Sequence, residues 1–473
     1  MLFSSTTFLY YFLPAVLLVY YGLLRRSRKL QNLFLTLASL FFYAWGEPKF
    51  VLVMLLSIAA NWLFGLGVER CRERHNPRGA KLWVTAAILF NLAILFLFKY
   101  LTFTLKNLVW LLPEGFSIPE IALPIGISFF TFQALSYVLD VYRGAGAVQK
   151  NIVHVGLYIS LFPQLIAGPI VRYQTVAEEI LHRRENTEDF FDGFARFVVG
   201  LCKKVLLSNS LSVFADYAFA HTGELTAAYA WLGAVCYTLQ IFFDFSGYSD
   251  MAIGLGRMFG FHFLENFDYP YISRSVTEFW RRWHISLGTW FRDYVYFPMG
   301  GNRVSRRRHL LNLFAVWLLT GIWHGANWTF VAWGLMYFVL LAVEKLTGLD
   351  KAQTGTLGTA ARRTYTLLFV MLGWVIFKSD SLGHTWQYFG AMLGGNGTGL
   401  WDGLFLRDFR TALVPLAAAV LFSIPVANYV KKRFSTCGGL PQVLYYAVLF
   451  LLFVLSIASI ESSAHNPFIY FNF

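Results

Sequence analysis

The chain has 473 residues, of which 57% are apolar and only 14% are charged. Soluble globular proteins carry about 25% charged residues, so this composition excludes an ordinary soluble protein and predicts a polytopic membrane protein. The formal net charge of +13 arises from lysines and arginines that cluster in short loops, which indicates cytoplasmic loops and requires no nucleic acid partner.

About a dozen apolar segments are candidates for membrane spans or shorter re-entrant helices. In chain order they cover residues 7–24, 30–45, 50–68, 82–98, 121–139, 152–171, 194–220, 227–243, 310–341 (counted as two), 364–378, 411–430 and 443–460. The first segment lacks a preceding basic region and a following cleavage site, so we interpret it as a retained span. We therefore expect one all-α membrane domain over residues 1–473, with about 11–13 transmembrane and re-entrant helices.

The loops predict the orientation of the spans. Arg25–Lys29 and Glu69–Lys81 are basic, whereas Gly46–Pro48 between them is not. Because basic loops stay on the cytoplasmic side, the N-terminus is expected outside. A second basic cluster at Lys431–Arg433 followed by one more span places the C-terminus outside as well.

Proline and glycine interrupt several of these apolar segments. Examples are Pro124 with Gly126, Pro163, and Gly168 with Pro169. Broken helices persist at membrane depth only where they are buried in protein or line a cavity, so we expect a central chamber. A transporter would show the same feature, and this alternative stays open, although no period relates one half of the chain to the other.

Residues 268–308 form the longest polar interruption. This segment mixes arginine with tryptophan, phenylalanine and tyrosine, a composition typical of interfacial or re-entrant helices. We expect it on the cytoplasmic side, with Arg306–Arg308 extending toward lipid head groups.

His324 lies inside the apolar run 310–341, next to Trp323 and Asn327. A titratable group at membrane depth is costly without a partner, so it is a candidate functional residue. The alternative is a histidine that joins two helices through a hydrogen bond.

A second histidine, His284, follows Arg281 and Arg282 in the aromatic-basic segment. A re-entrant fold could bring both imidazoles to one chamber. The four cysteines have no regular spacing, and no cluster of carboxylates is present, so we expect no metal and no cysteine chemistry.

Several stretches resemble the membrane-bound O-acyltransferase superfamily, and most of all its bacterial alginate O-acetylase and peptidoglycan O-acetylating members. The histidine motifs are FWRRWHISL at Phe279–Leu287 and GIWHG at Gly321–Gly325. The other similar stretches are Phe291–Tyr294, Pro298–Arg303, Met1–Tyr21, Leu161–Arg172 and Phe243–Gly254.

The resemblance implies acyl transfer through the membrane, from a cytoplasmic donor to an acceptor outside, with His324 at the junction. An imidazole can accept the proton of a hydroxyl that attacks a thioester. The resemblance also implies a role for His284 in orienting substrate or stabilising the oxyanion. Trp323 and Asn327 would line the substrate site, and Arg281 and Arg282 would contact donor phosphates, with head-group contact as the alternative.

The motif DFSGYSD places Asp244, Ser246 and Asp250 next to an apolar stretch. Asp244 and Ser246 are candidate substrate-binding residues. The alternative is structural: the carboxylates would pair with Arg281 or Arg282 and hold the re-entrant segment.

The chain ends in an aromatic tail within residues 461–473, with FIYFNF at Phe468–Phe473. Dispensable tails are generally polar, so this one is expected to be buried outside the cytoplasm. It resembles the tyrosine-bearing C-terminal motif of these acyltransferases. Our hypothesis is that Tyr470 carries the acyl group as a relay; the alternative is a plug that only packs the chamber.

The resemblance implies acetyl-CoA as donor, no bound cofactor, an exported cell-surface polysaccharide as final acceptor, and an extracytoplasmic serine transferase of the SGNH type as partner. It implies the bacterial inner membrane as location. D-alanyl or other acyl transfer from a carrier protein, a transporter, and a non-catalytic subunit of a polymer-export complex remain alternatives.

Overall fold

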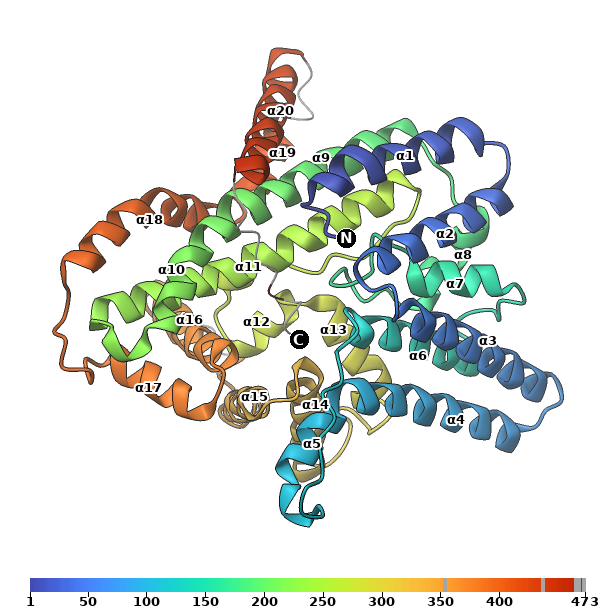
Figure 1. The fold of residues 1–473 in the computed structure, drawn as a ribbon, viewed down its shortest axis with the longest axis horizontal. Helices are drawn as coiled ribbons and strands as arrows, with labels where there is room; N and C mark the ends of the chain where they lie inside the picture. Colours follow the sequence, from blue (N-terminus) through green and yellow to red (C-terminus); the bar gives the residue numbers. More distant parts are fainter. Residues whose placement is uncertain (352–354, 435–438, 463–468, 470–473) are drawn as a thin grey trace. The chain divides into compact units, whose positions relative to one another are not determined.

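The computed structural model describes residues 1–351, 355–434, 439–462 and 469, with side chains left out at 427, 428, 431 and 432. Throughout these residues the regular structure is helical, as the composition predicted (Figure 1). The chain forms two compact units, residues 1–197 with 249–264 and residues 198–248 with 265–473. Two of the three unit boundaries fall inside helices, namely α9 (Thr187–Cys202) and α11 (Ala227–Met258), and the third falls in the loop after α11.

The first unit begins with a continuous helical segment, η1 to η2 (Phe8–Leu23), at the predicted first span. The helices that follow are α2 (Arg28–Gly46), α3 (Val51–Glu73), α4 (Pro77–Leu95), η3 (Phe96–Tyr100), α5 (Leu101–Asn107), η4 (Val109–Leu111), α6 (Ile127–Arg143), α7 (Ile152–Ser160) and α8 (Tyr173–His182). Amide groups join α3 to α4, because Asn91 donates to Asn61 Oδ1 at 2.8 Å. Such polar contacts supply specific attraction between helices where lipid offers no hydrophobic driving force.

The predicted break after residue 160 is present. Between α7 and α8 the chain runs through a buried, irregular stretch over residues 161–172. Its polar groups are satisfied by neighbouring helices; for example, the amide of Phe162 donates to Ser39 Oγ at 3.0 Å. This agrees with the rule that irregular backbone at membrane depth is enclosed by protein.

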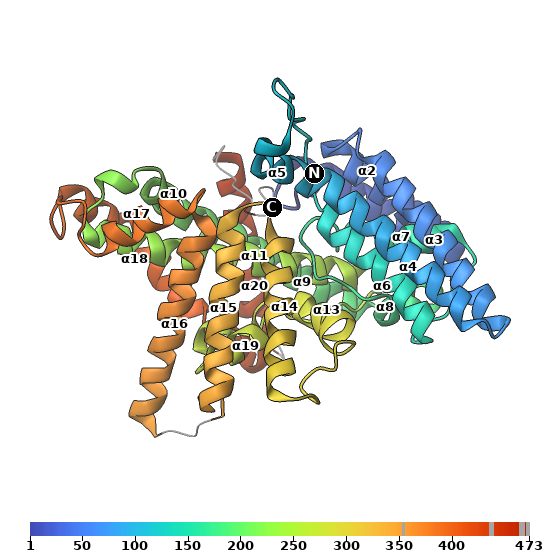
Figure 2. The ribbon, with the colours of Figure 1, turned by 90° about the horizontal axis from the view of Figure 1, so that it is seen from below.

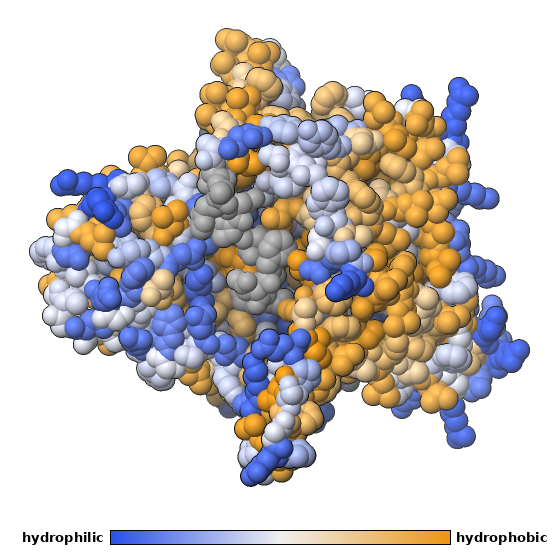
Figure 3. All heavy atoms as spheres, viewed as in Figure 1, coloured by the Kyte–Doolittle hydropathy of each residue, from blue (hydrophilic) through white to orange (hydrophobic). Residues whose placement is uncertain are grey.

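The surface of the first unit has the apolar character expected of a lipid-facing surface. Figure 3 shows a broad hydrophobic area over these helices and hydrophilic residues at the end where α3 turns into α4. α2 and α3 are consecutive helices joined by a short loop, so the basic stretch before α2 and the basic turn after α3 lie at the same end.

The second unit carries both candidate histidines. Its helices, after the last turn of α9, are η5 (Lys203–Ser208), α10 (Asn209–Ala220), η6 (Thr222–Glu224), most of α11, η7 (Pro270–Ile272), α12 (Val276–Arg282), α13 (Ile285–Phe291), η8 (Arg292–Tyr296), α14 (Arg306–His324), α15 (Trp328–Thr347), α16 (Thr356–Lys378), α17 (Leu382–Met392), α18 (Gly403–Phe422), α19 (Val426–Phe434) and α20 (Gly439–Ser462).

α14, α15 and α16 stand side by side (Figure 2). Two glycines allow α14 and α15 to approach closely: a Cβ on Gly321 would lie 2.5 Å from Phe330 O, and one on Gly334 would lie 2.5 Å from Trp317 O. The predicted division of 310–341 into two spans is confirmed, since α14 ends at His324 and α15 begins at Trp328.

Six helices of the described residues are long and apolar enough to cross a membrane: 51–73, 77–107, 187–220, 328–347, 356–378 and 439–462. Several predicted boundaries were wrong: the segment expected at 121–139 is α6 (Ile127–Arg143), and the one expected at 152–171 is helical only to Ser160. The span expected to end at 243 continues as α11 to Met258, because buried polar groups of the DFSGYSD motif are accommodated inside the helix. The expectation of a single domain over 1–473 and of a re-entrant segment at 268–308 stays a prediction.

Candidate active site

The backbone around His284 is held by a second loop of the same unit. The amide of Ile285 donates to Asn266 O at 3.0 Å, and that of Asp268 donates to Arg282 O at 2.9 Å. His284 itself has φ +46°, and Tyr269 has φ +45°. Non-glycine residues in this left-handed region cost free energy, so the surrounding hydrogen bonds are what hold the turn between α12 and α13 in place.

Asn266 determines which nitrogen of His284 carries the proton. Asn266 Oδ1 accepts from Ser286 N at 3.2 Å and from Ser286 Oγ at 2.9 Å, and it lies 3.2 Å from His284 Nδ1. Because a carbonyl oxygen only accepts, Nδ1 donates, and Nε2 keeps its lone pair. Burial lowers the pKa of His284 to about 3, so the ring is neutral near pH 7.

A buried carboxylate fixes the start of α12, the helix that leads to His284. Glu344 on α15 is fully buried and accepts from Val276 N at 2.7 Å, Thr277 N at 2.8 Å and Thr277 Oγ1 at 2.7 Å. A negative group at a helix N-terminus satisfies amides that have no partner within the helix. α12 is therefore attached to α15, the helix that follows His324.

His324 is the last residue of α14 and is 5% exposed. Its ring lies edge-on among three aromatic rings, with centroids 5.0 Å away for Trp323 and Trp333 and 5.1 Å for Phe377. The carboxyl end of a helix stabilises positive charge, which favours an imidazolium formed at this position. The site thus combines restricted ring motion with an environment suited to a base.

Trp323 joins the two histidines. Its ring centroid is 5.0 Å from that of His324 and 6.2 Å from that of His284, with T-shaped geometry in both pairs. These separations are within the range of direct aromatic contact. The structure thus brings His284 to the adjacent residues Trp323 and His324, which follow it by about 40 positions in the sequence.

Arg282 pairs with carboxylates of its own segment, residues 268–308. It forms ion pairs at 3.0 Å with Asp268 and with Glu278, whereas the side chain of Arg281 is exposed. The expectation that Asp244 or Asp250 pairs with these arginines was wrong. Each aspartate instead pairs with a cation closer to it on a neighbouring helical segment.

Those partners are identified by distance. Asp244 lies 2.5 Å from Lys204, and Asp250 lies 2.8 Å from Arg196. Ser246 is buried on the same helix as Asp244. Asn327 caps the start of α15, where its side chain accepts from Thr329 N at 3.1 Å and donates to Asp380 O at 2.8 Å. Tyr470 lies outside the described residues.

Sequence reasoning missed three residues that shape this site: Asn266, Glu344 and Lys204. Glu344 and Lys204 left a signal, because each is a charged residue within an apolar helical stretch. Asn266 left none, since an asparagine in a loop is ordinary and its role depends on the fold.

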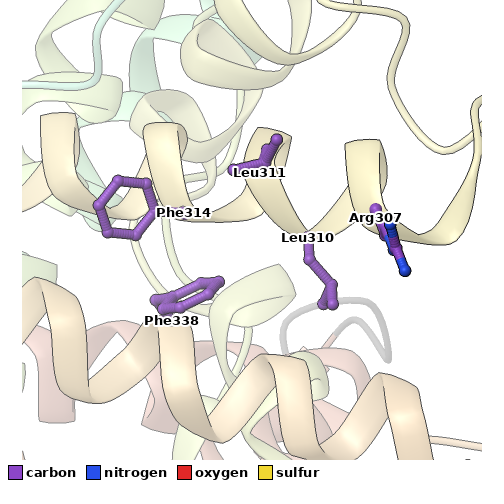
Figure 4. Close-up of a pocket in the computed structure, with 5 residues that line it drawn as sticks. All are labelled: Arg307, Leu310, Leu311, Phe314 and Phe338. Atoms are coloured by element: carbon purple, nitrogen blue, oxygen red, sulfur yellow. The ribbon is translucent and has the colours of Figure 1, made fainter.

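A groove elsewhere in this unit is lined by Arg307, Leu310, Leu311, Phe314 and Phe338 and measures about 490 Å³ (Figure 4). Phe314, the lining residue nearest His324 along α14, precedes it by 10 residues, or about 15 Å at 1.5 Å per residue, so this groove is separate from His324. Within the part of the chain that the structure describes, no group of three or more His, Cys, Asp or Glu residues is placed to hold a metal ion.

Comparison with known proteins agrees with this geometry. The model of the membrane-bound O-acyltransferase family matches residues 80–378, which include both histidines. A probable alginate O-acetylase AlgI from Azotobacter vinelandii is 38% identical over the full length of both chains. A peptidoglycan O-acetyltransferase from Helicobacter pylori is 30% identical over all of this chain and 98% of its own. A teichoic acid D-alanyltransferase from Bacillus subtilis is 27% identical over 55% of this chain and 70% of its own.

A transporter or a non-catalytic subunit of a polymer-export complex would explain neither the family match nor the contact of His284 and His324 with Trp323. The chain therefore belongs to the membrane-bound O-acyltransferase family and is an integral membrane acyltransferase.

Proposed function

We propose that this protein transfers an acetyl group from cytoplasmic acetyl-CoA, across the bacterial inner membrane, for O-acetylation of an exported cell-surface polysaccharide. Relatives that match the whole chain are an alginate O-acetylase and a peptidoglycan O-acetyltransferase by name, which supports the acetyl group and the glycan acceptor. The observation that carries the proposal is the contact of His284 and His324 with one tryptophan.

In the proposed reaction His324 is the general base. Its ring accepts the proton of the acceptor hydroxyl as the hydroxyl oxygen attacks the thioester carbonyl carbon. The tetrahedral intermediate then collapses, the C–S bond breaks, and the imidazolium returns its proton to the departing thiolate. The position of His324 at the carboxyl end of α14 stabilises the imidazolium formed between these two steps.

His284 has a different proposed role. With Nδ1 bonded to Asn266, its Nε2 accepts hydrogen bonds and cannot donate one to an oxyanion. This arrangement favours the first of the two roles that the resemblance implied, orientation of a substrate hydroxyl. Arg281, which is exposed, is the proposed contact for donor phosphates.

The first acceptor in this proposal is Tyr470, which then passes the acyl group to an extracytoplasmic serine transferase of the SGNH type. The basic loops at one end of the first unit support a cytoplasmic location for that end, and hence an N-terminus outside. The C-terminal tail would lie outside as well, where the partner is found.

The test is turnover of labelled acetyl-CoA by the purified protein in nanodiscs, with intact-mass analysis of the C-terminal peptide. His324→Ala is expected to reduce turnover by about 10²- to 10⁴-fold, the usual contribution of a general base. His309→Ala is the matched control, because His309 lies at the opposite end of the same helix. Equal turnover by wild type and His324→Ala would exclude this role for His324.

One observation supports a second donor. The match to a D-alanyltransferase extends over 55% of this chain, so an acylated carrier protein is to be supplied in a parallel reaction. Turnover with the carrier and none with acetyl-CoA would replace the donor and leave the role of His324 unchanged.

A further inference from the structure

A buried ion pair lies in the second unit, beside Phe245, whose ring centroid is 4.6 Å from that of His284. Lys204 Nζ on η5 is 2.5 Å from Asp244 Oδ1 on α11, and the two side chains are 2% and 1% exposed. Removing both charges from water costs several kcal/mol per ion, which their attraction repays only when further hydrogen bonds complete the site. A pair this deeply buried is a weak source of stability, so its presence calls for another role.

The second carboxylate oxygen of Asp244 receives a hydrogen bond from the end of the chain. The backbone amide of Ile469 donates to Asp244 Oδ2 at 3.0 Å, and Ile469 is 8% exposed. The two residues are 225 positions apart in the sequence. Hydrogen bonds to a charged acceptor are about twice as strong as neutral ones, so this contact is a substantial anchor.

The helix before the tail is attached to the same region. α20 packs against η5, and Ser456 Oγ lies 3.3 Å from Cys202 Sγ, two residues before Lys204. The chain is therefore fixed near Lys204 at both ends of the stretch from 457 to 468. Tyr470 follows Ile469 directly in the sequence, so the residue whose amide Asp244 binds is the neighbour of the proposed acyl acceptor.

Further polar groups lie on the same face of α11. Tyr237 and Gln240 precede Asp244 by seven and four residues, which is the spacing of one helix face, and both are buried. Tyr237 Oη and Gln240 Oε1 have no hydrogen-bond partner among the described residues. Asp244, which accepts from Ile469, is thus the last of three buried polar side chains along this face of α11.

We propose that the Lys204–Asp244 pair is the docking site of the C-terminal tail and that Asp244 is a positioning residue for acyl transfer to Tyr470. The assignment of Tyr470 rests on the function proposed above; the docking does not. Lys204 keeps the carboxylate charged and oriented, and Asp244 holds the tail backbone, so that the tyrosine is presented to the acyl group. This explains why a costly ion pair is kept inside the protein.

The test compares two double variants, both without the ion pair. Lys204→Met/Asp244→Asn keeps a carbonyl oxygen for the amide of Ile469, whereas Lys204→Met/Asp244→Leu has no acceptor. Changing both partners avoids an uncompensated buried charge, which would destabilise the fold by itself. Arg196→Met/Asp250→Leu is the matched control, because it removes the other ion pair of the same motif on α11.

Docking is measured as the rate of chymotrypsin cleavage after the aromatic residues of the tail, followed by intact mass in nanodiscs. The Leu variant is expected to be cleaved about tenfold faster than wild type, corresponding to loss of one hydrogen bond to a buried acceptor. The Asn variant and the Arg196/Asp250 control are expected to stay within about threefold of wild type. Equal cleavage of the Leu variant and wild type, with unchanged thermal unfolding, would overturn the docking site.

Acyl transfer to Tyr470 is measured separately from docking of the tail. With labelled donor, the Leu variant should lose the mass increase at Tyr470 and also the release of free thiol, because the acyl group then has no acceptor, and the Asn variant should recover both. The two parts of the proposal can fail separately. If chymotrypsin cleaves the tail faster in the Leu variant but the wild-type protein never carries an acyl group on Tyr470, the docking site is supported and the relay is rejected. Equal acylation of Tyr470 in the Leu variant and wild type would reject the positioning role.

Discussion

At the scale of single residues, the state of His284 depends on one neighbour. Asn266 Oδ1 accepts a hydrogen bond from His284 Nδ1 and two more from the amide and the hydroxyl of Ser286. The ring therefore has one tautomer and one orientation. The imidazole is neutral because burial disfavours its charged form. A role as hydrogen-bond acceptor follows from these two facts, and neither can be inferred from the motif FWRRWHISL.

We predict that Asn266→Ala lowers acyl transfer by about 10- to 100-fold, since an unsatisfied buried donor costs about 1–3 kcal/mol and frees the ring to rotate. Turnover of labelled donor measures the effect. Ser286→Ala should have a smaller effect, because it removes a donor to Asn266 and the longer 3.4 Å contact of Ser286 Oγ with His284 Nδ1, and leaves the 3.2 Å contact of Asn266 with His284. Wild-type turnover by Asn266→Ala would show that the orientation of His284 does not matter.

At the scale of elements, the active site depends on how α12, α14 and α15 are joined. Gly321 and Gly334 allow α14 and α15 to approach, and Glu344 attaches the first turn of α12 to α15. Tertiary contacts therefore hold the short helix α12, whose seven residues would be marginal alone. The histidine motifs carry the proposed chemistry, and these contacts hold the segments that bear the two histidines.

Replacing Glu344 tests this attachment. Glu344→Leu leaves three buried donors without an acceptor, and we expect it to lower the free energy of unfolding by about 3 kcal/mol or more. Glu344→Gln should cost less, because one acceptor oxygen remains. Thermal unfolding in nanodiscs measures both. Glu278→Gln, at a partly exposed ion pair, should change stability by about 1 kcal/mol or less, and a similar loss in all three variants would contradict a special role for Glu344.

At the scale of the whole molecule, the basic loops predict the direction in which the acyl group would cross the membrane in the proposed reaction. The segments before α2 and after α3 lie at one end of the first unit, as expected for two cytoplasmic loops.

Cysteine labelling in whole cells tests this topology. With the native cysteines replaced, Arg26→Cys and His75→Cys should both react with a membrane-impermeant maleimide only after permeabilisation. Glu47→Cys, in the loop between α2 and α3, should react in intact cells. Labelling of residues 26 and 75 from outside would reverse the proposed direction of transfer.

The sequence by itself determined the class of protein and the chemistry. Excess apolar residues require lipid contact, breaks at Pro163 and Gly168 require enclosed irregular backbone, and a histidine within an apolar run requires a function or a partner. These conclusions hold because composition and local pattern act through solvation and backbone sterics, which do not depend on distant contacts.

Only the tertiary structure decided which groups meet. It paired Asp244 with Lys204 in place of Arg281 or Arg282, extended α11 through the DFSGYSD motif, and gave roles to Asn266 and Glu344. These outcomes depend on contacts between residues up to 68 positions apart, and buried charges and amides accept whichever partner the packing places within hydrogen-bond distance. The sequence around each residue does not indicate which distant residue it will contact, so these pairings depend on the fold.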